Sequence, residues 1–201
     1  SPLRLSTTHA SSYGSGDIAT NVQFGADSLS TNTSGNGNTA IGNSALKLVS
    51  TGTGNTGVGY LSLENNTNSN NTALGYRSLR ANTSGSYNVG LGVDALLSNS
   101  TGTNNTAIGG QALSSNIGSD NTAVGYQAGL SNTGGVEITA IGQQALRNNI
   151  GGGYNTAVGS SALTSNSSGV RNTAVGRTCL TSNITGNYNV AIGMFALNSS
   201  N

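Results

Sequence analysis

Large aliphatic residues recur along the chain at a nearly constant interval, and a glycine follows each of them. Phe24 takes the aliphatic place in the first copy. The closing glycines are Gly25, Gly42, Gly59, Gly75, Gly92, Gly109, Gly125, Gly142, Gly159, Gly176 and Gly193. Two of the intervals between them are one residue shorter than the others. A fixed short period, here about 17 residues, predicts a solenoid, in which each repeat forms one coil and packs only against its neighbours.

Each glycine closes a five-residue unit of the form Asn-Thr-Ala-Ile/Val-Gly, as in residues 155–159. Asn stands first in every copy but one, where Ile138 replaces it. Alternation along a strand places Thr and the aliphatic residue on one face and Asn, Ala and Gly on the other. We predict one short parallel β-strand for each repeat, with the recurrent glycine at a structural corner that needs positive φ or close backbone approach.

Two variable, mostly polar residues follow the glycine, and then come a small residue and Leu. The pattern breaks only at Gly129, where Leu130 comes one place later. We predict that the variable pair forms a corner and that the small residue and Leu begin a second strand. A further Asn column, seven residues after the glycine, predicts a ladder of hydrogen-bonded amides.

The rest of each repeat is a segment of Ser, Thr, Gly and Asn, which we predict to be a surface loop. Both one-residue deletions can be placed in it, between Asn66 and Asn71 and between Asn116 and Asn121. Charged residues avoid the strand and the small-Leu pair in every copy. We therefore expect those positions to be shielded from water.

Composition narrows the function classes. Only 6% of the 201 residues are charged and the formal net charge is +1, so the chain has no basic patch for a nucleic-acid partner. No apolar run approaches the roughly 20 residues of a membrane-spanning helix, so we expect no membrane insertion. The single cysteine, Cys179, stands in a column of Ala and Ser and is expected to pack as a small apolar residue.

Two segments are predicted from the extent of the repeats. Residues 1–20 do not fit the period and are expected to be an N-terminal cap or pairing segment, and residues 21–201 form the β-solenoid repeat domain. The fold class is all-β: a parallel β-solenoid of about eleven coils, each of about 17 residues. At about 4.8 Å per coil, the repeat domain is roughly 50 Å long.

The strand faces also predict an oligomer. One face is bulky and β-branched and the other is small and uncharged, so neither suits open water. If the small face lies inside, the aliphatic column forms a long exposed stripe of a kind that soluble monomers seldom tolerate. A cyclic homotrimer would cover the stripe with copies of itself.

The unit N-T-A-[IV]-G-x-x-A-L resembles the head repeats of trimeric autotransporter adhesins and, still more closely, repeats of phage tail-fibre proteins. The resemblance covers about residues 21 to 201. It implies a left-handed parallel β-roll, a rigid trimer, and an extracellular place on a virion tail fibre or a cell surface, to which the fibre attaches. The unit is longer here than in the autotransporter head, and the choice between a viral and a cellular owner stays open.

No catalytic constellation is apparent. The chain has one His, His9, outside the repeats, and its six acidic residues are spread over different coils. Phosphate-binding, dinucleotide-binding and Ca²⁺-binding glycine patterns are not matched. We therefore expect no enzyme, no cofactor and no metal site.

Recognition of a cell-surface glycan or protein receptor is expected at the corner and loop columns, where the repeats vary most. The candidate contact residues in the corner column are Tyr60, Tyr76, Tyr126, Arg77 and Arg177. Tyr87, Tyr154 and Tyr188 occupy the loop column five residues before the glycine. The alternative interpretation is that these tyrosines only cap and stack on neighbouring coils.

Two other functions fit the same repeats. The last repeat ends just before Asn201, which would leave an open coil edge and would suit an extracellular filament subunit that assembles end to end. The column of Thr residues from Thr39 to Thr173 would suit an ice-binding solenoid, although Val22, Val89 and Val190 take the place of Thr in their repeats.

Overall fold

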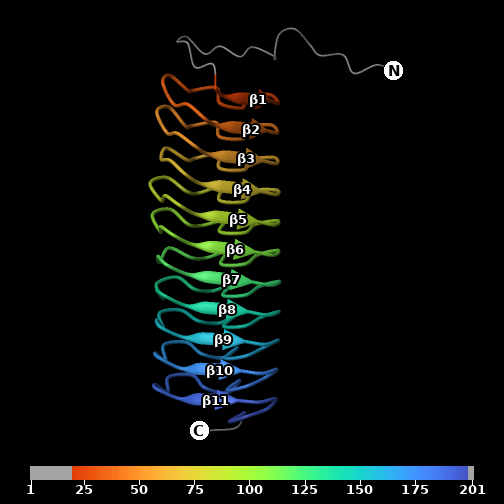
Figure 1. Ribbon diagram of the computed structural model, residues 1–201, viewed down its shortest axis with the longest axis vertical. Helices are drawn as coiled ribbons and strands as arrows, with labels where there is room; N and C mark the ends of the chain where they lie inside the picture. Colours follow the sequence, from red (N-terminus) through yellow and green to blue (C-terminus); the bar gives the residue numbers. More distant parts are fainter. Residues whose placement is uncertain (1–19, 199–201) are drawn as a thin grey trace, which may run out of the picture.

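The computed structural model describes residues 20–198, so the predicted N-terminal segment lies outside the described residues except for Thr20. The described chain winds into a straight stack of coils, with β1 and β11 at opposite ends (Figure 1). Each repeat contributes one strand of three residues to a single sheet. The strands are β1 Val22–Phe24, β2 Thr39–Ile41, β3 Thr56–Val58, β4 Thr72–Leu74, β5 Val89–Leu91, β6 Thr106–Ile108, β7 Thr122–Val124, β8 Thr139–Ile141, β9 Thr156–Val158, β10 Thr173–Val175 and β11 Val190–Ile192.

Every strand pairs in parallel with the strand of the next repeat, so sheet order follows chain order. Equivalent positions of neighbouring repeats are paired throughout the sheet. For example, Thr39 pairs with Thr56, and Ile41 pairs with Val58. The predicted all-β parallel solenoid is therefore confirmed, with eleven strands and about ten coils of the expected length. No helix occurs within residues 20–198.

The two shortened repeats keep the strands in register. In the first, Thr56 still pairs with Thr72 although the chain between them is one residue shorter than in a regular repeat. The missing residue is absorbed in the loop, where Asn71 Nδ2 donates directly to Asn66 Oδ1 at 3.1 Å. Asn121 and Asn116 make the equivalent bond at 3.0 Å in the second shortened repeat. The predicted position of both deletions is thus confirmed.

The predicted second strand is wrong. The small residue and Leu lie in a turn, because the residue two places after each corner glycine and the Leu itself both have positive φ, as at Ser161 (59°) and Leu163 (50°). Positive φ is incompatible with extended backbone. The turn is still tied to the next coil, since the Leu163 N–H donates to the Cys179 carbonyl at 3.0 Å.

The corner glycines close the strands with φ between 121° and 137°. At Gly159, a Cβ would stand 2.5 Å from the Gly176 carbonyl oxygen of the next coil. Both the dihedral and the close approach require glycine here.

The interior is formed by the small face of the sheet and by the Leu column. Ala157 of β9 and Leu163 of the following turn are fully buried, as are their equivalents in most other coils. Thr156 and Val158 lie on the outer face and are only half-buried. The expected shielding therefore holds for the inward positions, whereas in the single chain the Thr and aliphatic columns face outward.

Two ladders of buried Asn side chains run through this interior and join the coils. In the column seven residues after the glycine, Asn149 Nδ2 donates to Asn132 Oδ1 at 2.7 Å and Asn166 Nδ2 donates to Asn149 Oδ1 at 2.8 Å. In the column before the strand, Asn172 donates from both its main-chain N and its Nδ2 to Asn155 Oδ1. Every buried side-chain N or O atom within residues 20–198 has a hydrogen-bond partner, so the polar interior is fully satisfied.

Candidate binding surfaces

Three surfaces of the stack face solvent and carry side chains suited to recognition. The outer face of the sheet lies between two edges (Figure 1). We call the edge beyond the strand ends, formed by the two residues after each corner glycine, the corner edge. The edge formed by the loops that lead into the strands is the loop edge.

The corner edge brings Tyr60 and Tyr76 of successive repeats together. Their rings are stacked, with centroids 5.6 Å apart and planes inclined by 11°. The two side chains are about half exposed. The Arg77 guanidinium carbon lies 4.9 Å from the Tyr76 ring centroid. The result is an aromatic platform of two stacked rings, with the guanidinium over the Tyr76 ring.

Asp94 of the next repeat orients Arg77. Arg77 Nε and Nη2 donate to Asp94 Oδ1 and Oδ2, each at 2.9 Å, which is the bidentate geometry of a strong ion pair. The bond to Asp94 raises the pKa of Arg77 above its ordinary value. Because the carboxylate neutralises the guanidinium, the Tyr60-Tyr76 platform carries no net charge. Asp94 was not among the residues predicted from the sequence, although its place in the same column one repeat after Arg77 was a usable signal.

The other two candidates in this column are not part of the platform. Tyr126 lies three coils beyond Tyr76, or about 14 Å along the stack. Its neighbour Gln127 belongs to a short amide ladder, donating from Nε2 to Gln111 Oε1 at 2.8 Å. Arg177 lies still further along, with its guanidinium carbon 5.9 Å from the Phe195 ring centroid.

The loop edge holds a second aromatic cluster. Tyr154, Arg171 and Tyr188 occupy the same column in three successive repeats, and the Arg171 guanidinium lies over both rings. The loop column of the sequence pointed to the two tyrosines, but Arg171 was not among the candidate contact residues. The signal that joins them is their separation by one full repeat each, which places them on adjacent coils.

The outer face of the sheet is a stripe of Thr and aliphatic side chains. Near its middle, 50% of Leu74 and 38% of Ile108 are exposed. No charged residue belongs to any of the eleven strands. This face is therefore flat, regular and largely apolar over the length of the stack.

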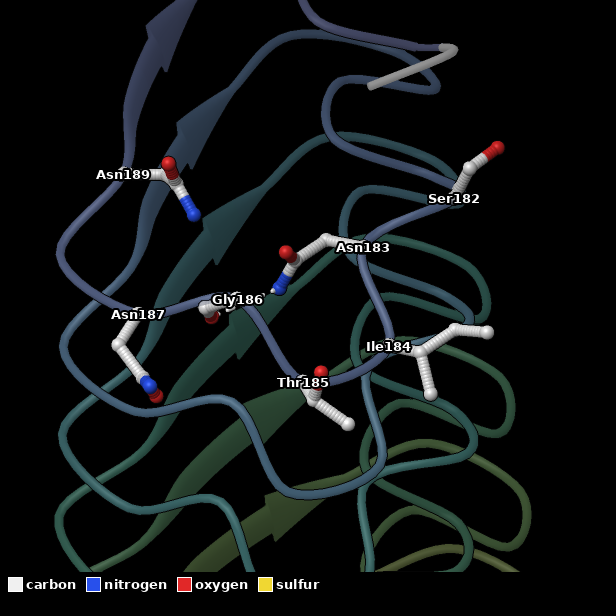
Figure 2. A pocket seen from close by; sticks show the side chains of 7 residues that line it. All are labelled: Ser182, Asn183, Ile184, Thr185, Gly186, Asn187 and Asn189. Carbon is white, nitrogen blue, oxygen red and sulfur yellow. Dashed lines mark hydrogen bonds between the residues drawn. The ribbon is translucent and has the colours of Figure 1, made fainter. Parts of the chain in front are cut away.

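A hollow at the end of the stack is lined by Ser182, Asn183, Ile184, Thr185, Gly186, Asn187 and Asn189 (Figure 2). Asn183 Nδ2 donates to the Gly186 carbonyl there at 3.1 Å, the bond that Asn166 makes to Gly169 one coil earlier. One coil earlier, the equivalents of Asn183, Gly186 and Asn189 are buried beneath the next coil, as Asn166, Gly169 and Asn172 show. The hollow is thus an uncovered coil interior, and its polar groups are those of the ladder.

The part of the chain that the structure describes holds no group of three or more side chains able to bind a metal ion. None of its segments is a helix long and apolar enough to cross a membrane. Comparison of the chain with models of protein families, with curated proteins and with solved structures found no match.

Proposed function

We propose that the repeats form a structural and adhesive segment of an extracellular fibre, a left-handed β-roll that assembles as a homotrimer. The fibre would belong to a phage tail or to a cell-surface adhesin and would bind a glycan or protein receptor on a cell surface. In this proposal the chain is not an enzyme and needs no cofactor.

The observation that carries the proposal is the uncharged aliphatic stripe on the outer face of the sheet. At about 4.8 Å per coil and about 3.3 Å per strand residue, the stripe together with the Thr column beside it measures roughly 50 by 10 Å. Such a stripe is at the upper end of what soluble monomers expose. Because every coil presents it in the same direction, three parallel chains related by a threefold axis along the stack can cover it together.

Light scattering on the intact chain tests the assembly. We expect a discrete trimer, and we expect the double substitution Leu74→Asp and Ile108→Asp to dissociate it, because charges would be buried between chains. The matched control is the double substitution Ile117→Asp and Ile150→Asp, which places the same two charges at loop side chains of similar exposure. An open polymer, or a monomer that the double substitution leaves unchanged, would contradict the trimer.

Receptor contact is assigned to the neutral Tyr60-Tyr76 platform, since rigid aromatic faces give contact area at low entropic cost. A trimer repeats the platform three times, so weak contacts add through multivalency. Binding of the trimer to a cell surface should fall when Tyr60 and Tyr76 are both changed to Ser. If the variant stays trimeric and binds as well as the parent, the platform only supports the coils.

Ice binding is the second candidate function, and the flat outer face with its Thr column favours it. The two functions compete for that face, because a trimer covers it and ice binding needs it free. A monomer with thermal hysteresis that is lost on Thr106→Asp would favour ice binding over the fibre.

A further inference from the structure

The cluster of Tyr154, Arg171 and Tyr188 on the loop edge has the arrangement of a binding site. The Arg171 guanidinium carbon lies 5.0 Å from the Tyr154 ring centroid and 5.6 Å from that of Tyr188. Arg171 Nη1 also donates to the Tyr188 hydroxyl at 3.2 Å. The two rings thus flank one cation.

The main chain holds the cluster rigidly. The N–H groups of Tyr154, Arg171 and Tyr188 donate to the carbonyls of Val136, Gly153 and Val170, respectively, at 2.9 to 3.2 Å. The spacing of the three side chains is therefore set by the spacing of the coils.

The backbone conformation of these three residues is unfavourable for their residue types. All three have φ between 56° and 60°, a region that Gly and Asn adopt more easily. Gly37, Gly54 and Asn70 hold the same column in the first coils. Tyr87, Asp120 and Glu137 hold the same column with positive φ in other coils. The coil thus demands positive φ here but no particular side chain, and the cluster places two tyrosines and an arginine where glycine would cost less.

The charge of Arg171 is uncompensated. Within residues 20–198, ion pairs join Lys47 to Asp27, Arg77 to Asp94 and Arg80 to Glu64, and none includes Arg171. The nearest acid in the same column, Glu137, is two coils away, or about 10 Å. The loop-edge cluster is therefore cationic, whereas the Tyr60-Tyr76 platform is neutral.

We propose that Tyr154, Arg171 and Tyr188 bind a carboxylated sugar, such as a uronic or sialic acid unit of an acidic glycan. Because the tyrosine rings lie over the guanidinium of Arg171, a ligand can reach only the N–H groups in its plane. A planar carboxylate accepts two such N–H groups side by side. The tyrosine hydroxyls, at the rim of the same cluster, can donate to and accept from sugar hydroxyls. Tyr154 and Tyr188 are 47% and 69% exposed, which leaves room for the sugar ring.

The inference rests on the proposed adhesive function for its biological setting, but its test does not depend on trimer formation. The intact chain is titrated with sialyllactose and with trigalacturonate, and in parallel with lactose as the neutral probe. We expect both acidic probes to bind at least about tenfold more tightly than lactose, because a charge-assisted bidentate contact is worth that much or more.

Three variants decide whether the cluster is responsible. Arg171→Gln should remove the preference for acidic sugars, and Tyr154→Ser with Tyr188→Ser should weaken binding of both acidic probes. The matched control, Arg147→Gln, removes the same charge from a residue outside the cluster and should leave the preference intact. Circular dichroism on each variant checks that the coils remain folded.

The inference is overturned if acidic and neutral probes bind equally, if neither acidic probe binds, or if Arg147→Gln weakens binding as much as Arg171→Gln. If changing Tyr60 and Tyr76 to Ser abolishes cell-surface binding while Arg171→Gln has no effect on any probe, the adhesive function is supported and this site is rejected. If the chain binds acidic sugars through Arg171 but is not a trimer, this site is supported and the trimeric fibre is rejected.

Discussion

Ile138 fills the space that the absent Leu leaves at Gly129. A Cβ on Gly129 would stand 3.6 Å from Ile138 Cδ1 and 2.8 Å from Leu113 Cδ2, and Ile138 is buried in the same apolar core as the Leu column. These two departures from the repeat pattern therefore compensate each other. The compensation has a cost, because Ile138 carries no amide and interrupts the ladder between Asn121 and Asn155.

A double-mutant cycle tests this pairing. Ile138→Asn leaves a void beside Gly129, and Gly129→Leu collides with Leu113 and Ile138, so each alone should lower the free energy of unfolding by about 1–3 kcal/mol. Together they restore the consensus coil, and the loss should largely vanish, giving a favourable coupling between the two sites. Urea denaturation of all four proteins measures the coupling, and additive losses would contradict it.

The corner glycines should not tolerate a side chain. Gly159→Ala places a Cβ 2.5 Å from the Gly176 oxygen at a φ of 137°, so we expect a loss of at least about 3 kcal/mol. Gly151 is the matched control, because a Cβ there meets nothing within 4 Å. Gly151→Ala should be neutral or stabilise by up to about 1 kcal/mol. Equal melting temperatures for the two variants would argue against the corner geometry.

The Asn ladder should contribute more than its surface neighbours. Asn149→Ala removes the donor to Asn132 Oδ1 and to the Gly152 carbonyl, both buried in the ladder. Leaving these acceptors unpaired should cost about 2–4 kcal/mol. Asn148→Ala, at the exposed side chain next to it, should change stability by no more than about 0.5 kcal/mol. Thermal unfolding of the two variants measures the difference in stability. Similar melting temperatures would mean that the ladder is dispensable.

The two faces of a strand should respond differently to charge. Ala157→Asp buries a carboxylate in the coil interior and should cost more than about 3 kcal/mol. Val158→Asp points outward and should cost no more than about 1 kcal/mol in the isolated chain, while it weakens self-association. Denaturation combined with light scattering separates these effects. Severe unfolding by Val158→Asp would show that the aliphatic column is internal.

Cys179 should behave as an inert core residue. Its Sγ donates to the Ala191 carbonyl at 3.2 Å, as Ser78 Oγ does to Gly90 at 2.8 Å. Cys179→Ser should therefore change stability by less than about 1 kcal/mol. Burial raises the pKa of the Cys179 thiol, so the thiolate is scarce at neutral pH, and reaction with a disulfide reagent should be slow until the coils open. Rapid modification of the folded chain would contradict this burial.

Much of the fold follows from the repeat itself. The fixed period predicted the solenoid, the Asn column predicted a ladder such as that from Asn132 to Asn166, and the positions of the deletions predicted which loops shorten. These predictions succeeded because stacked identical units place each residue above its equivalent. Residues that are one repeat apart in the sequence therefore lie next to each other on adjacent coils. The same rule would have joined Tyr154, Arg171 and Tyr188 in advance.

The sequence by itself therefore determined the parallel stack, its register and the uncharged strand columns, since these depend only on the period and on side-chain alternation. The tertiary structure decided which face of the strand lies inside, because Ala and Val are both apolar and only the space within the coil selects the smaller. It also decided that Leu163 lies in a turn. Positive φ at Ser161 and Leu163 results from closing a narrow coil, and Ser and Leu are not residue types that predict positive φ. The ion pair of Arg77 with Asp94 and the compensation of Gly129 by Ile138 likewise depend on side-chain reach between coils.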